Sequence, residues 1–164
     1  MKIRKITSDD AQVFLTLQNK LDEETEFRVY EPDERKTTPE EMEKIISSKQ
    51  EDLILLAIND DDVVGYIEAE RGKFNRNKHS AHINLAVLKK FHGRGIAKLF
   101  FDEVEKWAKL NDIHRLDLCV FISNTNAINL YNKMGFVKEG TKKDSFLVDG
   151  NYVDEFMMAK IIEK

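Results

Sequence analysis

Two glycines stand where a strand pattern turns into a long amphipathic helix, and this feature constrains the fold most. The segment is AVLKKFHGRGIAKLFFDEVEKWAK, residues 86–109. Glycine weakens both strands and helices, so Gly93 and Gly95 indicate a backbone that must stay bare or turn sharply. The first N–H groups of the helix have no intrahelical partner, and the helix dipole adds partial positive charge there. Such a turn is typical of phosphate binding, although a tight turn flanked by solvated lysines fits the spacing equally well.

Two common phosphate-binding motifs do not fit this segment. A Walker loop ends in Gly-Lys-Ser/Thr, whereas the helix here begins GIAKLF. A dinucleotide-binding fingerprint needs a third small residue and an acid about 20 residues further on. Lys98 occupies the third position, and the next strand ends in FISN without an acid. The turn therefore belongs to another class of phosphate site or is purely structural.

The rest of the chain alternates between strand-like and helix-like patterns. Strands are expected at about residues 2–6, 52–58, 63–71, 79–88 and 115–121, and on both sides of the Asp-Gly turn at 149–150. Helices are expected after Thr7 or Ser8, after the Thr38 cap, after the glycine turn and over residues 126–134. This order predicts a single α/β domain over residues 1–164, built on a mixed, mostly antiparallel sheet flanked by helices.

Apolar periodicity predicts the buried faces of two helices. The first carries Ala11, Phe14, Leu15, Leu17 and Leu21, and the helix after the glycine turn carries Phe100, Val104 and Leu110, with Trp107 packed beside them. Between the first two helices, residues 22–38 are polar and irregular. Loops of this length are usually functional, so we expect a role beyond connection.

The composition restricts the class of protein. At 164 residues, 41% of them hydrophobic and 34% charged, the chain is long enough to bury the core of one domain. A net charge of −4 argues against a nucleic-acid-binding surface. The single cysteine, Cys119, fits a reducing compartment, and the longest apolar run, residues 53–58, is too short to cross a bilayer. We therefore expect a cytoplasmic protein that binds neither nucleic acid nor membranes, and a homodimer is left open.

The glycine turn and a second motif together resemble the GNAT (Gcn5-related N-acetyltransferase) family. The family's pyrophosphate loop, Arg/Gln-x-x-Gly-x-Gly/Ala, is matched by residues 92–97, with only His92 departing from the pattern. The second motif, Asn-x-x-Ala-x-x-Leu-Tyr-x-Lys-x-Gly-Phe, is met in full between Asn124 and Phe136. The resemblance covers about residues 82–136, and it implies the GNAT fold, acetyl-CoA as co-substrate and no metal.

The resemblance also implies which residues bind acetyl-CoA. The strand before the turn would offer backbone groups to the pantetheine arm and the acetyl carbonyl, and the loop would hold the pyrophosphate mainly through backbone N–H groups. The implied set is Leu85, Ala86 and Val87 on the strand, His92, Gly93, Arg94, Gly95, Ile96, Ala97 and Lys98 in the loop, and Asn124. Asn124 fits equally well as the cap of the helix that it begins.

Tyr131 is implied to protonate the departing thiolate. A phenol with a pKa of about 10 can donate to a thiolate whose conjugate acid has a pKa near 8.5, although pattern alone makes Tyr131 a core aromatic. The general base is harder to assign, because Cys119 stands where some members of the family carry a glutamate. His82 on the strand before the loop is the candidate, with Glu31 or a chain of water molecules as alternatives.

The acceptor is expected to be a primary amine of a small molecule that enters beside the polar loop. Tyr30, Glu31 and Arg35 are the candidate binding residues there, against the simpler reading of a solvated acidic loop. Carboxylates would attract a protonated amine, and Arg35 would instead favour an acceptor that carries a carboxylate. Acetylation of a protein N-terminus or lysine, and a non-catalytic module that senses acyl-CoA, are the alternative functions.

Overall fold

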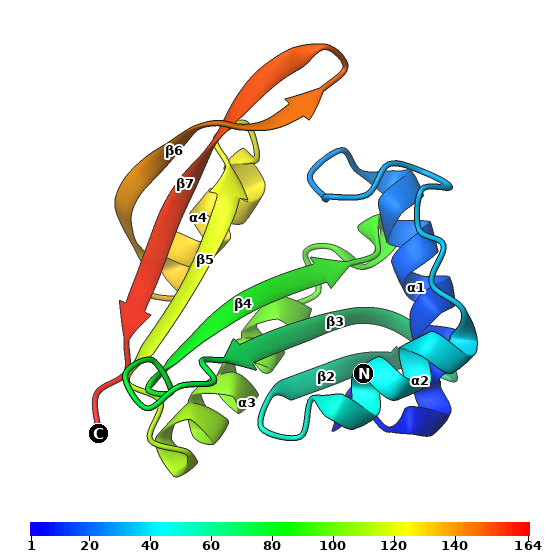
Figure 1. Cartoon of the computed structure of the whole chain (residues 1–164), viewed down its shortest axis with the longest axis horizontal. Coiled ribbons are helices and arrows are strands. Elements are labelled where there is room, and N and C mark those ends of the chain that lie inside the picture. The colour runs from blue at the N-terminus through cyan, green and yellow to red at the C-terminus, as the bar shows by residue number, and fades with distance from the viewer. The chain divides into compact units, whose positions relative to one another are not determined.

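The computed structural model describes all 164 residues. It contains seven strands and four α-helices (Figure 1). Their bounds are β1 Lys2–Lys5, α1 Ala11–Glu24, α2 Pro39–Ser48, β2 Leu53–Asn59, β3 Asp62–Arg71, β4 Ser80–Val87, α3 Ile96–Leu110, β5 Arg115–Phe121, α4 Thr125–Lys133, β6 Val137–Val148 and β7 Asn151–Ile161. Two short 3-10 turns, η1 Ser8–Asp10 and η2 Lys89–Phe91, precede α1 and α3.

The strands form one sheet in the order β1-β2-β3-β4-β5-β7-β6. The β1–β2, β2–β3, β5–β7 and β6–β7 pairs are antiparallel, and the β4–β5 pair is parallel. The predicted mixed, mostly antiparallel sheet flanked by helices is therefore confirmed. Backbone contacts group the chain into two compact units, residues 1–70 with 84–104, and residues 71–83 with 105–164. That residues 1–164 act as one domain stays a prediction.

In the first unit, α1 packs on the face of β3 that carries Tyr66. The predicted face of α1 is confirmed, since Ala11, Phe14, Leu15, Leu17 and Leu21 are 2–6% exposed. The rings of Phe14 and Tyr66 meet edge to face with centroids 5.1 Å apart. Ile67, on the opposite face of β3, is fully buried, so both faces of this strand are covered.

The predicted core stripe of α3 is right at Phe100 and Val104 and wrong at Leu110. Phe100 and Val104 are 0% exposed, whereas Leu110 is 84% exposed. A helical repeat of 3.6 residues continues the stripe from Val104 to Ala108, which is fully buried, and turns Leu110 away from it. Trp107 is half-buried beside the stripe.

In the second unit, β5 has one buried face and one half-exposed face. Leu116, Leu118 and Val120 are 0–5% exposed, and the residues between them alternate with partial exposure. The β6–β7 hairpin closes through Asp149 and Gly150, both with positive φ (50° and 78°). This is the backbone of a two-residue hairpin turn, and it confirms the turn predicted from Asp-Gly.

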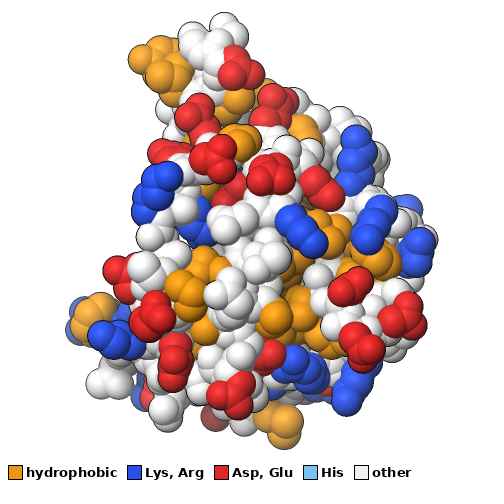
Figure 2. Space-filling model, turned by 90° about the vertical axis from the view of Figure 1, so that its right-hand side faces the viewer, with side chains coloured by type: hydrophobic (Ala, Val, Ile, Leu, Met, Phe, Trp, Pro, Cys, Tyr) orange, Lys and Arg blue, Asp and Glu red, His pale blue; other side chains and the backbone are white.

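Two further findings concern membrane-spanning helices and the charge of the surface. No helix is both long and apolar enough to span a bilayer. Figure 2 shows acidic and basic side chains spread over the face that it presents, with hydrophobic side chains only in small groups. This mixture agrees with a charged fraction of 34% and a small net charge of −4.

Asp10 ties η1 to the first strand. Its two carboxylate oxygens accept hydrogen bonds from the guanidinium of Arg4 at 2.7 and 2.8 Å, and one of them also accepts the backbone N–H of Thr7 at 2.8 Å. The hydrogen bonds from Arg4 are the main reason that the pKa of Asp10 is lowered from 3.8 to about 2. Ionised Asp10 therefore stabilises the fold.

Asp10→Asn should destabilise the protein at neutral pH and less so in acid. Because the pKa is lower in the folded state, the contribution is complete above about pH 4 and is lost as the pH falls toward 2. The loss at pH 6 should reach up to about 2 kcal/mol and shrink to roughly half at pH 3. Urea unfolding at both pH values measures it, with exposed Asp9→Asn as control. An equal loss at both pH values would contradict the assignment.

Candidate active site

The glycine-rich turn joins η2 to α3 in the first unit. Gly93 and Gly95 have φ values of +72° and +77°, in the left-handed region that favours glycine. A Cβ atom built on either residue would meet no atom within 4 Å. Backbone conformation, not crowding by the protein, therefore requires glycine here, and the space in front of both residues is open.

The start of α3 supplies hydrogen-bond donors beside this open space. The N–H of Leu99 donates to the carbonyl of Gly95 at 3.2 Å, which makes it the first bond of the helix. The N–H groups of residues 96–98 would need the carbonyls of residues 92–94, which lie before the helix. These donors and the positive end of the helix dipole suit an anion, and phosphate is the anion that most often uses such a site.

Side chains of the loop are largely engaged with the protein itself. Nε2 of His92 lies 2.7 Å from the carbonyl oxygen of Val87, so the imidazole fastens the loop to the end of β4. The guanidinium of Arg94 lies 4.8 Å from the ring centre of Phe91. The ammonium of Lys98 is paired with Asp102 at 2.7 Å, one helical turn further on. Backbone groups are therefore the main ligands that this loop can offer.

The register between β3 and β4 is fixed at their ends in the first unit. The N–H of Leu88 donates to the carbonyl of Val64 at 2.9 Å. One residue earlier in β4, Val87 stands opposite Gly65, since a Cβ on Gly65 would lie 3.1 Å from the Cα of Val87. Hydrogen-bonded and non-hydrogen-bonded pairs alternate along an antiparallel ladder.

Because of this alternation, the backbone groups of Leu85, Ala86 and Val87, the three strand residues predicted from the sequence, do not all point to the same edge of β4. Ala86 stands opposite Tyr66 and directs its N–H and carbonyl toward β3. Leu85 and Val87 direct theirs to the other edge of β4. Because the carbonyl of Val87 accepts from His92, the N–H groups of Leu85 and Val87 and the carbonyl of Leu85 are the groups that can serve a ligand.

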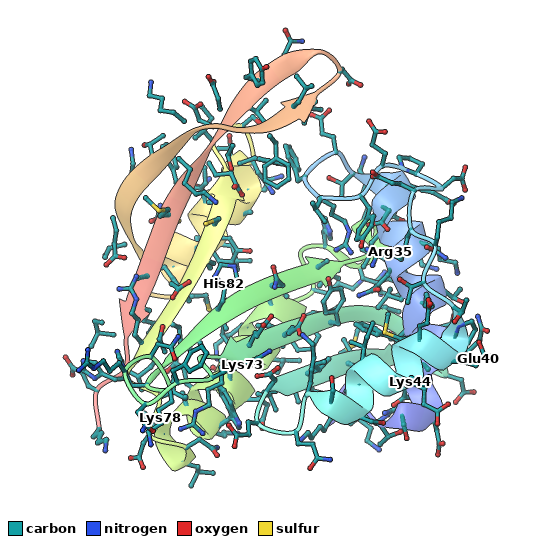
Figure 3. The ribbon with its side chains drawn as sticks, in the orientation of Figure 1. Arg35, Glu40, Lys44, Lys73, Lys78 and His82 are labelled. Atoms are coloured by element: carbon teal, nitrogen blue, oxygen red, sulfur yellow. The ribbon has the colours of Figure 1, made fainter.

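The polar loop of the first unit spans residues 25–38, because α1 continues to Glu24. Glu31 is exposed, and its backbone N–H donates to the side chain of Glu34 at 2.8 Å. Arg35 is instead largely buried: its guanidinium stacks 4.1 Å from the ring centre of Tyr30 and binds Asp22. Figure 3 shows Arg35 beside α1. The structure thus brings Tyr30 and Arg35 together and leaves Glu31 apart from them.

Tyr131 and Asn124 lie in the second unit, on and before α4. The side chain of Asn124 accepts the N–H of Ala127 at 3.3 Å, so it caps the helix as the alternative reading predicted. Tyr131 is 8% exposed, and its ring lies 5.9 Å from that of Phe136. Tyr131 is therefore held in a fixed orientation inside this unit.

His82 is paired with a carboxylate on the adjacent strand of the second unit. Its Nδ1 lies 2.6 Å from Oδ1 of Asp117, and the hydroxyl of Ser80 donates to the other oxygen of Asp117 at 3.2 Å. The hydrogen bond with His82 is the main cause that lowers the pKa of Asp117. An ionised Asp117 holds Nδ1 protonated, which directs the imidazole lone pair to Nε2.

Sequence reasoning missed Asp117, because it lies 35 positions from His82 in the chain and on a different strand. It also missed Asp22, which binds both Arg28 and Arg35 in the first unit. Asp117 could have been identified only from the parallel alignment of β4 with β5, which pairs residue 82 with residue 117.

Cys119 is a free, half-buried cysteine in surroundings that favour its neutral thiol. Burial, with a further contribution from the charge of Glu155, raises the pKa of its thiol above the ordinary value. Glu155 itself is 8% exposed and accepts a hydrogen bond from the hydroxyl of Ser145 at 2.5 Å. No group of three or more His, Cys, Asp or Glu side chains is arranged to hold a metal ion.

Comparison with known proteins decides the family. Residues 17–136 match the family model described as the acetyltransferase (GNAT) family. This chain is a GNAT acetyltransferase. It is 34% identical over 111 residues to the L-amino acid N-acetyltransferase of Escherichia coli strain K12, an alignment that covers 65% of this chain and 67% of that protein. The predicted family, fold and enzyme class are confirmed.

Solved structures have the same fold over their full lengths. The GNAT acetyltransferase from Streptococcus pneumoniae superimposes with a TM-score of 0.93 at 27% identity, covering 99% of both chains. YncA from Salmonella typhimurium, solved with its cofactor acetyl-CoA, superimposes with a TM-score of 0.87 at 16% identity, covering 100% of this chain and 95% of that one. The second similarity is one of fold alone.

Proposed function

We propose that this GNAT acetyltransferase transfers the acetyl group of acetyl-CoA directly to a primary amine of a small molecule. The observation that carries the proposal is the turn at Gly93 and Gly95, where bare backbone, open space and unpaired helix N–H groups coincide. The E. coli relative, named for L-amino acids, supports a small-molecule acceptor. The single cysteine agrees with a cytoplasmic enzyme.

The chain holds acetyl-CoA mainly through backbone groups. The pyrophosphate lies on the N–H groups of residues 93–98, assisted by the charges of Arg94 and Lys98. The N–H groups of Leu85 and Val87 bind the pantetheine arm and the acetyl oxygen, where negative charge develops during transfer. Bound in this way, acetyl-CoA supplies a thioester that is activated for attack by an amine.

Proton transfer is assigned to two side chains of the second unit. His82, oriented by Asp117, accepts a proton from the ammonium form of the acceptor, directly or through water. Tyr131 donates a proton to the sulfur of coenzyme A as the thiolate leaves, a transfer that is uphill by only about 1.5 pKa units because thiols are somewhat more acidic than phenols. Cys119 stays a neutral thiol, since its pKa is raised.

Gly95→Ala should lower the affinity for acetyl-CoA more than it lowers stability. The added methyl group occupies the open space through which a phosphate oxygen approaches the backbone. Gly150→Ala is the matched control, because Gly150 has a similar φ of +78° and equally open surroundings in the β6–β7 turn. Both variants carry backbone strain of roughly 1–2 kcal/mol. Calorimetric titration should give weaker binding only for Gly95→Ala; equal affinity in the two variants would place the pyrophosphate elsewhere.

Tyr131→Phe should lower turnover and spare acetyl-CoA affinity, because the hydroxyl acts in the transition state. General acid catalysis is typically worth about 10²- to 10⁴-fold. Release of coenzyme A thiol, measured across a panel of amines, tests this variant and the proposed function together. If the wild-type protein binds acetyl-CoA but none of the amines causes thiol release, the acyl-CoA-sensing alternative is favoured. Unchanged turnover in the variant would make Tyr131 a packing residue.

A further inference from the structure

A buried carboxylate in the first unit binds two arginines. Asp22, in the last turn of α1, has a side chain that is 2% exposed. Its Oδ1 accepts from Nε of Arg28 at 2.6 Å, and Arg35 donates to both oxygens, at 2.9 and 3.3 Å. The arginine side chains are 13% and 9% exposed. The Asp22–Arg28–Arg35 cluster therefore carries one net positive charge in a largely buried place.

Two hydrogen-bond donor groups of the cluster have no acceptor within the protein. Nη1 of Arg28 donates to the hydroxyl of Tyr66 at 3.2 Å, while Nη2 of Arg28 and Nη1 of Arg35 donate to no acceptor of the protein. Oε1 of Gln18 is the one buried side-chain N or O atom that has no hydrogen-bond partner. The two amino groups of Arg28 and Arg35 are not among such atoms, so they must reach solvent. A guanidinium pair with outward donors and an uncompensated charge is suited to a carboxylate.

The unpartnered oxygen of Gln18 belongs to the same place. Phe14, Gln18 and Asp22 are spaced four residues apart on α1 and form one stripe along the helix. The first of them contacts the ring of Tyr66, and the last binds Arg28, which donates to the hydroxyl of Tyr66. Gln18 lies between these two contacts and is 9% exposed. Its oxygen is a buried acceptor without a donor, and such atoms are rare in folded proteins.

The cluster is linked through Tyr66 to the part of β4 that we propose to hold the acetyl group. Tyr66 stands opposite Ala86 in the β3–β4 ladder, and residues that stand opposite each other project from the same face of a sheet. Their Cα atoms are about 5.5 Å apart in such a hydrogen-bonded pair. Tyr66, whose hydroxyl accepts from Arg28, therefore projects from the α1 side of the sheet opposite Ala86, which lies between Leu85 and Val87.

We propose that the Asp22–Arg28–Arg35 cluster binds the carboxylate of the acceptor, so that the acceptor is an α-amino acid or a close homologue. The carboxylate neutralises the net charge of the cluster and takes the outward donors of Arg28 and Arg35. Polyamines, which carry only positive charge, are disfavoured by the same cluster. This assignment rests on the proposed acetyl transfer to small amines.

The test compares amino acids with the amines that lack only the carboxylate. Methionine, phenylalanine and leucine are each paired with the corresponding decarboxylated amine, and spermidine is added. Coenzyme A release gives kcat/KM for each compound. The wild-type protein should prefer the amino acid of a pair by at least about 10-fold, the scale of a charge-assisted hydrogen bond.

Variants of Arg28 assign that preference to the cluster. Arg28→Gln should reduce the ratio of kcat/KM within a pair by about 10-fold or more, mainly through the KM of the amino acid. Arg28→Lys, which keeps the charge but loses the planar fork, should give an intermediate ratio. The exposed Arg76→Gln is the matched control and should leave the ratio unchanged. Unaltered acetyl-CoA affinity, measured by calorimetry, shows that each variant is folded.

The outcomes separate this inference from the proposed function. Equal kcat/KM within every pair, a preference for spermidine, or an unchanged ratio in both Arg28 variants would overturn the carboxylate site and leave acetyl transfer standing. Acetyl-CoA binding without thiol release from any amine would overturn the proposed function and this inference with it.

Discussion

The left-handed backbone at Gly93 and Gly95 is the constraint on which the proposed chemistry depends. Positive φ at both positions turns the chain from β4 into α3 without a Cβ atom in front of the helix N-terminus. The fastening of His92 to Val87 then holds this turn against the end of the strand. The donors that we propose for the pyrophosphate and for the acyl group thus follow each other along a single segment, residues 85–98.

The carboxylate of Asp22 in the first unit is arranged differently from that of Asp117 in the second. Asp22 is shared by two arginines and leaves positive charge over, which suits an anionic group. Asp117 instead binds the imidazole of His82 at 2.6 Å, with Arg115 3.6 Å from its other oxygen, and its lowered pKa keeps it ionised beside that ring. The arrangement around Asp22 suits a negatively charged ligand group. The His82–Asp117 pair suits an imidazole that accepts a proton.

Much of the fold could be predicted because its determinants are local. The apolar spacing of α1, the Asp-Gly hairpin turn and the glycine turn before α3 each depend on residues within a few positions of one another. Leu110 was misplaced because a stripe of spaced apolar residues was extended beyond its helical period. Asp117, Asp22 and Arg28 could not be predicted, since their partners come from other elements, and Arg35 was found without the carboxylate that binds it.

The central claim is that backbone N–H groups of residues 93–98 bind the pyrophosphate of acetyl-CoA. Amide chemical shifts of the ¹⁵N-labelled protein, titrated with coenzyme A and separately with pantetheine, which lacks the phosphates, test it most directly. The account predicts large shifts of the Gly93, Gly95, Ile96 and Ala97 amides with coenzyme A and small ones with pantetheine. Equal shifts of these amides with both compounds, or none with coenzyme A at saturation, would contradict it.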